Sequence, residues 1–220
     1  MGDFFIAVYT HEVKSYCDME FFSNIANFTL KDYELHVVDN TSHLEYIEKL
    51  GHLFESIGLY PKSITHIDVP TEPYVSCFQR KVCDSVNALR DKFLESDCKY
   101  FVIIESDVIP PIDVLETFLS VIDEGDIIGG IYYEDRHLDE WFDPEHKEII
   151  DDVVFSGCTL YKRDVIESIK FRIAQYDGVH FPDTIMSIDA HNAGHRRILY
   201  TGIKCKHLHA EDGSRNYIRL

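Results

Sequence analysis

Short apolar runs alternate with helix-like segments in the first part of the chain. Residues 4–9 and 35–38 are apolar runs rich in aromatic and branched side chains, which is typical of buried parallel strands. Residues 64–69 predict a third strand, and the intervening stretches 13–30 and 44–57 are compatible with helices. A strand, helix, strand, helix order is that of a doubly wound sheet, so the pattern predicts an α/β fold.

A long amphipathic helix precedes the most hydrophobic segment of the chain. Its apolar positions recur three and four residues apart, which marks one buried face of a helix that ends near Ser96. Residues 100–104 then form the most hydrophobic strand, and we expect them at the centre of the sheet. The apolar positions of the helix are Phe78, Val82, Val86, Leu89 and Phe93.

The same alternation continues after a Pro-Pro pair. Residues 114–122 have helical spacing, Gly125 is placed to end that helix, and residues 126–131 predict another strand. The polar and aromatic stretch 132–152 has weak periodicity and is interpreted as a loop. Because no repeat, linker or low-complexity tract interrupts the pattern, we expect one domain over residues 1–220.

The chain is strongly acidic. Its formal net charge is -18, with 21 Lys and Arg against 39 Asp and Glu, which disfavours nucleic acid as a partner. Any phosphate that binds must therefore be met locally by a cation. No apolar run approaches the roughly 20 residues that span a bilayer, and the start, MGD, lacks the basic region of a signal peptide. We therefore expect a cytoplasmic protein without a transmembrane segment.

The cysteines and histidines do not predict a zinc centre. The six cysteines are scattered, with no CxxC pair and no zinc-ligand spacing, so we interpret them as free and mostly buried thiols. The twelve histidines need a positional argument to select among them.

Two acids follow the predicted central strand directly, at Glu105 and Asp107. In an open α/β sheet, ligands sit beyond the carboxyl ends of the strands. Residues two apart in an extended chain share a face, so both carboxylates could approach one divalent cation that bridges a nucleotide diphosphate. The alternative is that these acids only end the strand and cap the next helix.

The acidic segment and its flanks resemble the DxD region of GT-A glycosyltransferases. Residues 100–119 carry this likeness, which is greatest to family-2-like members, with Glu105 where many members have Asp. Residues 36–40 are similar to the second-strand motif whose acidic residue faces the donor base, and residues 155–163 resemble the Gly-containing strand and turn on the acceptor side. The resemblance places donor-binding residues at Thr10, Asp39, Arg80, Ser106 and Gly157.

A later segment, PDTIMSIDAHNAGHRR, resembles the ED helix motif that supplies the catalytic base in this family. It assigns the base to Asp183, with Pro182 where the family usually has Glu. Asp189 is the rival, but it would lie more than one turn further along the helix. The alternative role for Asp183 is that of a helix cap.

The late segment around KHLH resembles the strand whose histidine completes the metal site. The resemblance assigns this role to His207, beside Glu105 and Asp107, while His209 on the same face is a neighbour or the alternative ligand. A mixed set of oxygen and imidazole ligands favours Mn2+ over Mg2+, with Mg2+ as the alternative.

Basic and aromatic residues give weaker assignments. Arg80 on the long helix is similar to a family residue that approaches the donor diphosphate, and its alternative role is that of a solvated basic residue. Tyr132, Tyr133 and Trp141 could stack on a sugar ring or anchor a loop.

The segments that carry the resemblance cover residues 4–209 in the family's order, and the chain resembles the compact glycosyltransferases of archaeal viruses and phages. The resemblance implies a GT-A fold, with a mostly parallel central sheet flanked by helices. It implies a metal-dependent, inverting transfer of a sugar from a UDP- or GDP-sugar to a saccharide, protein or lipid-linked acceptor, in the host cytoplasm if the chain is viral.

Three other functions remain open. A nucleotidyltransferase usually has a Gly-rich basic loop after the first strand, whereas YTHE stands there. A non-catalytic nucleotide-sugar-binding module would keep the fold without the chemistry. A His/Asp metallohydrolase would need several ligands at strand ends, and only the segments around Glu105 and His207 offer them.

Overall fold

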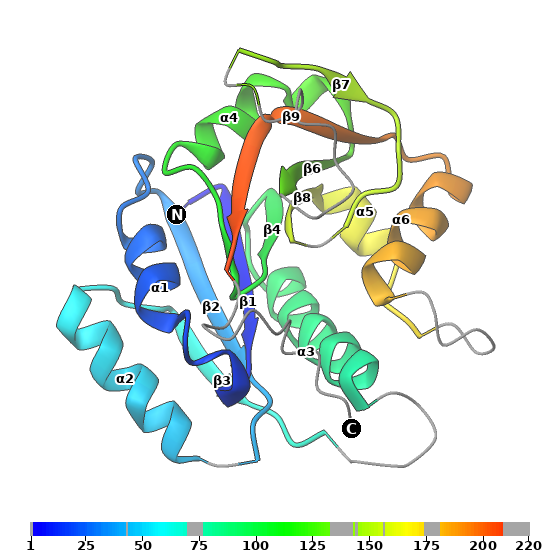
Figure 1. The fold of residues 1–220 in the computed structure, drawn as a ribbon. Helices are drawn as coiled ribbons and strands as arrows, with labels where there is room; N and C mark the ends of the chain where they lie inside the picture. The colour runs from blue at the N-terminus through cyan, green and yellow to red at the C-terminus, as the bar shows by residue number, and fades with distance from the viewer. Residues whose placement is uncertain are drawn as a thin grey trace.

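The described residues form one mixed β-sheet with helices on both of its faces (Figure 1). This computed structural model describes residues 2–42, 44–69, 77–132, 143, 145–155, 157–173 and 181–208, and at residues 77 and 78 it describes the backbone only. The strands lie in the order β3-β2-β1-β4-β8-β6-β9-β5, with β7 also paired to β9. The α/β architecture predicted from the sequence is confirmed.

The apolar runs of the first half form the parallel part of the sheet. β1 (Phe4–Thr10) lies between β2 (Tyr33–Asp39) and β4 (Tyr100–Ile104), and β3 (Ser63–His66) pairs with β2. Since all of these pairs are parallel, the carboxyl ends of the strands lie at one edge of the sheet. β4 lies in the middle of the strand order, as its hydrophobicity predicts.

The second half of the chain adds antiparallel pairs to the sheet. β8 (Cys158–Lys162) is antiparallel both to β4 and to β6 (Ile127–Tyr132). β9 (Arg197–His207) is parallel to β6, passes a register shift, and then pairs antiparallel with β5 (Val108–Ile109), while β7 (Ile149–Ile150) is antiparallel to its first part. The bend of β9 carries its last residue to the segment that follows β4 (Figure 1).

Helices cover both faces of the sheet. α1, α2 and α4 contribute to one hydrophobic cluster, and α3, α5 and α6 contribute to the other. The predicted apolar stripe of α3 is buried in the second cluster from Val82 to Phe93. The bounds are α1 (Asp18–Ala26), α2 (Glu45–Ile57), α3 (Cys77–Leu94), α4 (Val114–Ser120), α5 (Arg163–Ser168) and α6 (Pro182–Asn192), with short 3-10 helices at Glu12–Lys14 and Ile122–Glu124.

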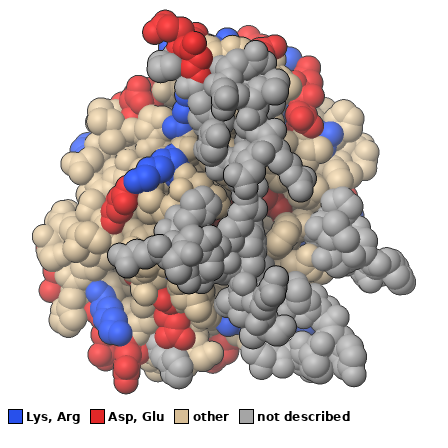
Figure 2. Space-filling view, viewed as in Figure 1, with Lys and Arg blue, Asp and Glu red and all other residues tan. Residues whose placement is uncertain are grey.

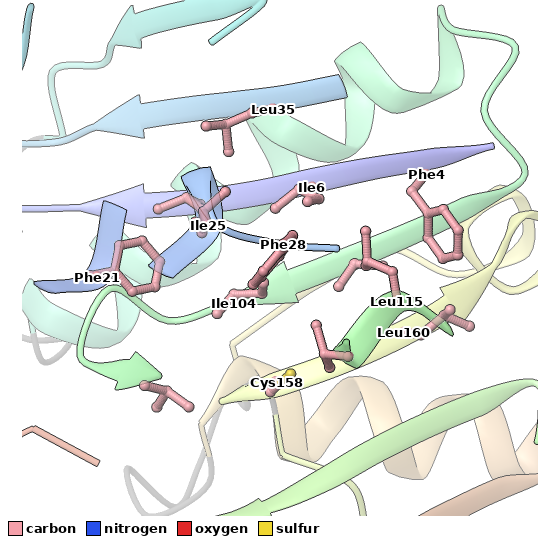
Figure 3. Close-up of a cluster of buried hydrophobic side chains, with 14 of the residues drawn as sticks. Phe4, Ile6, Phe21, Ile25, Phe28, Leu35, Ile104, Leu115, Cys158 and Leu160 are labelled. Carbon is pink, nitrogen blue, oxygen red and sulfur yellow. The ribbon is translucent and has the colours of Figure 1, made fainter. Parts of the chain in front are cut away.

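Alternate residues of β1 enter the two clusters. Phe4, Ile6 and Val8 pack with the side chains of α1 and α2, whereas Phe5 and Ala7 pack with those of α3. Figure 3 shows the first cluster, in which side chains of α1 lie over β1 and β4. A strand that is buried on both faces has no polar face, which explains the continuous apolar run in the sequence.

The predicted helix over residues 13–30 is wrong at its start. A 3-10 turn at Glu12–Lys14 comes first, and α1 begins only at Asp18. Cys17 lies between the two helices. Its Sγ lies 2.7 Å from the Lys14 carbonyl and 2.9 Å from the Ser106 carbonyl, so the thiol contacts both segments. The chain therefore turns here to contact the acidic segment after β4.

The predicted role of Gly125 as a helix terminator is also wrong. α4 ends at Ser120, and Gly125 follows the 3-10 turn in an extended conformation, with φ -159°. A Cβ atom at this position would lie 2.9 Å from a side-chain carbon of Ile198. The glycine therefore permits the close approach of β9.

The described surface reflects the composition of the chain. On the face shown in Figure 2, Lys and Arg side chains lie singly beside acidic ones.

Among the described residues no helix is long and apolar enough to cross a membrane. The described cysteines, at positions 17, 83, 98, 158 and 205, are free and buried, as predicted.

Candidate active site

Most of the predicted site residues lie at or next to the ends of neighbouring strands. Thr10 and Asp39 end β1 and β2, and Glu105 follows β4, which pairs with β1. Gly157 precedes β8, and its carbonyl accepts a hydrogen bond from the backbone amide of Glu105 at 3.0 Å. His207 ends β9 and pairs with the first residue of β5.

The acidic tripeptide forms a turn. The backbone amide of Val108 donates to the carbonyl of Glu105 at 2.9 Å, so the chain reverses directly after the first acid. The extended geometry that the sequence argument assumed is therefore absent here. The two carboxylates have different partners, and Glu105 Oε1 accepts a hydrogen bond from the Tyr9 hydroxyl at 2.7 Å.

Asp107 lies between a lysine and a histidine. Its Oδ2 is 2.8 Å from Lys14 Nζ and 3.5 Å from His207 Nε2, and the residue is only 8% exposed. Burial alone would raise the pKa of Asp107, but the charge of Lys14 and the contact with His207 hold that pKa at about 2. Burial opposes the charge on Lys14, while Asp107 and Glu105 raise its pKa above the usual value. Both partners of the pair are therefore charged at neutral pH.

The contact between Asp107 and His207 can hold a divalent ion only with added ligands. Carboxylate and imidazole are ligands that Mn2+ accepts, and Asp107 Oδ1 is buried without a hydrogen bond from any described residue. Glu105 is engaged by Tyr9, and in the described part of the chain no group of three His, Cys, Asp or Glu side chains is arranged to hold a metal. A cation here would take two protein ligands and complete its coordination with oxygens of a bound phosphate or of water.

Two of the predicted donor-binding residues lie in buried hydrogen-bond networks. Thr10 is 2% exposed, and its hydroxyl lies 3.0 Å from that of Tyr46, which donates to Asp18. Asp39 is fully buried, and it accepts hydrogen bonds from the amide and hydroxyl of Thr41 and from His66 Nδ1, at 2.8 to 3.2 Å. Its oxygens are thus used within the protein. The contact with Asp39 raises the pKa of His66.

Ser106 and Gly157 shape the acidic turn from both sides. Ser106 is buried, and its hydroxyl has no hydrogen-bond partner among the described residues. A Cβ atom at Gly157 would lie 2.5 Å from the ring of Tyr132. That ring in turn packs against His207, with 5.5 Å between the ring centroids. Glycine at 157 therefore lets an aromatic side chain position the histidine.

Asp183 lies in the first turn of α6 and is 9% exposed. Burial raises the pKa of the Tyr161 hydroxyl, and the negative charges of Asp183 and Glu105 raise it further, so both acids lie near this one phenol. Asp189, the rival base, is bound through both oxygens by Arg172, at 2.7 and 2.8 Å. Of the two acids on α6, Asp183 is the one whose charge, like that of Glu105, raises the pKa of Tyr161.

The fold is similar to that of solved nucleotide-sugar-bound structures. By sequence, the chain matches no protein-family model and no curated protein. By structure, S. aureus TarS 1-349 in complex with UDP-GlcNAc is similar with a TM-score of 0.63 at 14% identity, over 99% of this chain and 62% of that one. The mannosyltransferase PcManGT from Pyrobaculum calidifontis, in complex with GDP-Man and Mn2+, is similar with a TM-score of 0.65 at 14% identity, over 96% of this chain and 58% of that one. This chain has the GT-A fold.

At this level of identity the GT-A fold is what the similarity establishes, and this chain spans about three-fifths of the length of either solved chain, the first of which is the fragment 1-349 of TarS. The likeness to compact viral and phage enzymes stays a prediction.

Arg80, the basic residue predicted at the donor site of this GT-A fold, does not lie with the other site residues. Arg80 Nε lies 3.6 Å from Asp84 Oδ2, and both side chains are more than 40% exposed, as expected of a solvated pair. The next residue, Lys81, instead places its Nζ 3.0 Å from His11 Nε2. Lys14 is the second basic residue that the sequence analysis missed. Lys14 could have been found by applying the strand-end rule to the segment after β1 as well as to the segment after β4, whereas Lys81 lies on α3.

Several predicted residues lie outside the described residues, namely Tyr133, Trp141 and His209. Tyr132 is described, and its described contact is with His207.

Proposed function

We propose that this chain is a glycosyltransferase that moves a sugar from a nucleotide-diphosphate sugar to an acceptor hydroxyl with the help of a divalent cation. The observation that carries this proposal is the 3.5 Å approach of His207 to Asp107 at the edge of the sheet where Glu105 also lies. The GT-A fold supports it, because TarS and PcManGT were solved with UDP-GlcNAc and with GDP-Man and Mn2+.

The proposed roles follow from position and chemistry. Asp107 and His207 would hold the cation, and Glu105 would face it from the first residue of the turn. Mn2+ or Mg2+ in that position would supply positive charge for the leaving nucleotide diphosphate. Such a charge is needed because the chain itself carries a net charge of -18.

Asp183 is the proposed general base. It would take the proton from the acceptor hydroxyl while the acceptor oxygen forms its bond to the anomeric carbon and the bond to the diphosphate breaks. A single displacement of this kind inverts the anomeric centre. Asp189 is not suited to the role, because Arg172 binds both of its oxygens.

The donor side would be built by residues at the ends of β1 and β2. Asp39 is fully buried, so its proposed role is to hold Thr41 and His66 in place beside the nucleobase of the donor. It would not contact the nucleobase itself. Thr10, Ser106 and Gly157 would shape the floor of this site, and Arg80 is proposed as a long-range partner of the diphosphate. The donor is a UDP- or GDP-sugar, and the acceptor is a saccharide, a protein or a lipid-linked molecule.

The proposal is tested with a panel of UDP- and GDP-sugars, each incubated with Mn2+, Mg2+ or EDTA, with release of UDP or GDP as the readout. We expect release from at least one donor, stimulated by the divalent ion. Binding of a donor without any release would indicate a non-catalytic module. Pyrophosphate release from UTP or GTP would indicate a nucleotidyltransferase, although a 3-10 turn, Glu12–Lys14, stands after β1 instead of a Gly-rich loop.

A further inference from the structure

The ion pair between Lys14 and Asp107 occupies the place that a divalent ion needs. Lys14 Nζ lies 2.8 Å from the same Oδ2 atom that approaches His207. A divalent ion bound to that oxygen would lie about 2.0–2.6 Å from it. The ammonium group and the ion would then be only a few ångströms apart, where like charges repel strongly. The ammonium group and a divalent ion therefore compete for this oxygen.

Lys14 is anchored in this position by the backbone around it. Its amide donates to the His11 carbonyl at 2.8 Å, which closes the 3-10 turn. Cys17 Sγ lies within 2.9 Å of both the Lys14 and the Ser106 carbonyls, so one thiol connects the lysine turn to the acidic turn. Both side chains of the ion pair are mostly buried, with 17% and 11% of their surface exposed.

A second group of donors lies beside the same turn. His11 Nδ1 accepts a hydrogen bond from the amide of Val13 at 3.2 Å. Lys81 Nζ lies 3.0 Å from Nε2 of the same ring. A second ammonium group therefore borders the turn that carries Lys14, and ammonium groups are common ligands of phosphate.

We infer that Lys14 is a built-in cation of this site, which holds Asp107 in the metal-free protein, competes with a divalent ion for that carboxylate, and turns to the donor diphosphate when the donor binds. The last step rests on the proposed function. In this arrangement the diphosphate supplies the negative charge that lets the ammonium group and the divalent ion coexist. Divalent-ion binding and nucleotide binding are then positively coupled, and Lys14 carries much of the coupling.

The test is a titration of Mn2+ alone, followed by the paramagnetic resonance signal of free Mn2+, on the wild-type protein and on Lys14→Gln. We expect the substitution to tighten Mn2+ binding about tenfold, because it removes the competing ammonium group. Lys99→Gln is the matched control, since Lys99 forms an ion pair of similar length with Asp3 at the opposite end of β4. It should leave the Mn2+ affinity unchanged.

Two more variants keep the result interpretable. Asp107→Asn on the Lys14→Gln background should remove the gain in Mn2+ affinity. That result would show that the added ion binds to this carboxylate. Lys14→Arg keeps the charge and a fork of donors for the carboxylate, so it should not tighten Mn2+ binding, and it gives a second readout if Lys14→Gln does not fold. Unchanged or weaker Mn2+ binding by Lys14→Gln, or no Mn2+ binding by any variant, would overturn the inference.

A parallel titration with UDP and GDP in EDTA separates this inference from the proposed function. We expect weak metal-free binding by the wild-type protein that Lys14→Gln loses. If Lys14→Gln tightens Mn2+ but no variant binds a nucleotide diphosphate, the competition stands and the glycosyltransferase proposal fails. If donors are turned over while Lys14→Gln leaves the Mn2+ affinity unchanged, the proposed function stands and the role of Lys14 fails.

Discussion

The two ends of β4 carry ion pairs of the same chemistry in different surroundings. At the carboxyl end, Lys14 and Asp107 lie 2.8 Å apart with 17% and 11% of their side chains exposed. At the amino end, Lys99 and Asp3 lie 3.0 Å apart with 64% and 50% exposed. Distance alone does not distinguish these pairs. Burial does, because water screens the exposed charges and not the buried ones.

This difference extends to the whole carboxyl edge. Asp18, Asp39, Asp107 and Asp183 are all buried or nearly so, and they lie at or near the ends of the parallel strands or the helices beside them. Concentrating carboxylates in a buried region is unfavourable unless each has a partner. Here Tyr46 binds Asp18, His66 binds Asp39 and Lys14 binds Asp107. Each prediction below compares a buried group with an exposed one.

The largest effect is expected at the two acids of α6. Asp183→Asn should lower the transfer rate by about 10²–10⁴-fold while donor binding survives, because the variant lacks the proton acceptor. Asp189→Asn removes an acid from the same helix that is paired with Arg172, and it should change the rate by less than about threefold. Equal losses in the two variants would remove Asp183 as the base.

A smaller effect is expected on the pH dependence of stability. Burial raises the pKa of Asp18 from its ordinary value of 3.8 to about 6, although the hydrogen bond from Tyr46 lowers it in part. The folded protein therefore holds a proton that the unfolded chain releases, so the free energy of unfolding falls as the pH rises from about 4 to about 6. Asp18→Asn should remove this fall, which amounts to about 3 kcal/mol for about two pKa units.

The measurement is urea unfolding of the wild-type protein, Asp18→Asn and Asp3→Asn at pH 4, 5, 6 and 7. The stability of Asp18→Asn relative to the wild type should rise across this range, and that of the exposed variant Asp3→Asn should not. A difference between Asp18→Asn and the wild type that stays constant with pH would show that Asp18 titrates as an ordinary surface acid.

The direct comparison of the two lysines gives the smallest effect. Lys14→Gln leaves Asp107 buried without its ammonium partner and should lower the free energy of unfolding by about 2 kcal/mol. Lys99→Gln should have no measurable effect, since its pair is exposed. Equal unfolding midpoints for the two variants in urea would contradict the importance of burial.

The sequence predicts the parallel half of the fold well, because local patterns suffice there. The apolar runs of β1, β2 and β4 and the stripe on α3 are each visible in a few consecutive residues. The second half depends on pairing between distant segments. The antiparallel direction of β8 and the bend of β9 are set by partners far away in the chain, so no local pattern reports them.

The candidate site was predictable where it depends on strand ends and not where it depends on side-chain direction. The edge that holds Glu105 and Asp107 follows from the order of the strands, whereas His207 was assigned by the resemblance to GT-A glycosyltransferases. Lys14 was missed because its approach to Asp107 depends on a turn that replaces the expected helix. Arg80 and Lys81 differ by one position, yet successive helical residues point about 100° apart, so only one of them lies beside His11.

The central claim is that Asp107 and His207 hold the cation through which a nucleotide diphosphate binds. The most direct measurement is a calorimetric titration of UDP and GDP, with Mn2+ and with EDTA, into the wild-type protein, Asp107→Ala and the exposed control Asp3→Ala. We predict that Mn2+ strengthens binding of at least one nucleotide to the wild type and to Asp3→Ala, and that Asp107→Ala loses this enhancement. An equal enhancement in all three proteins would contradict the account.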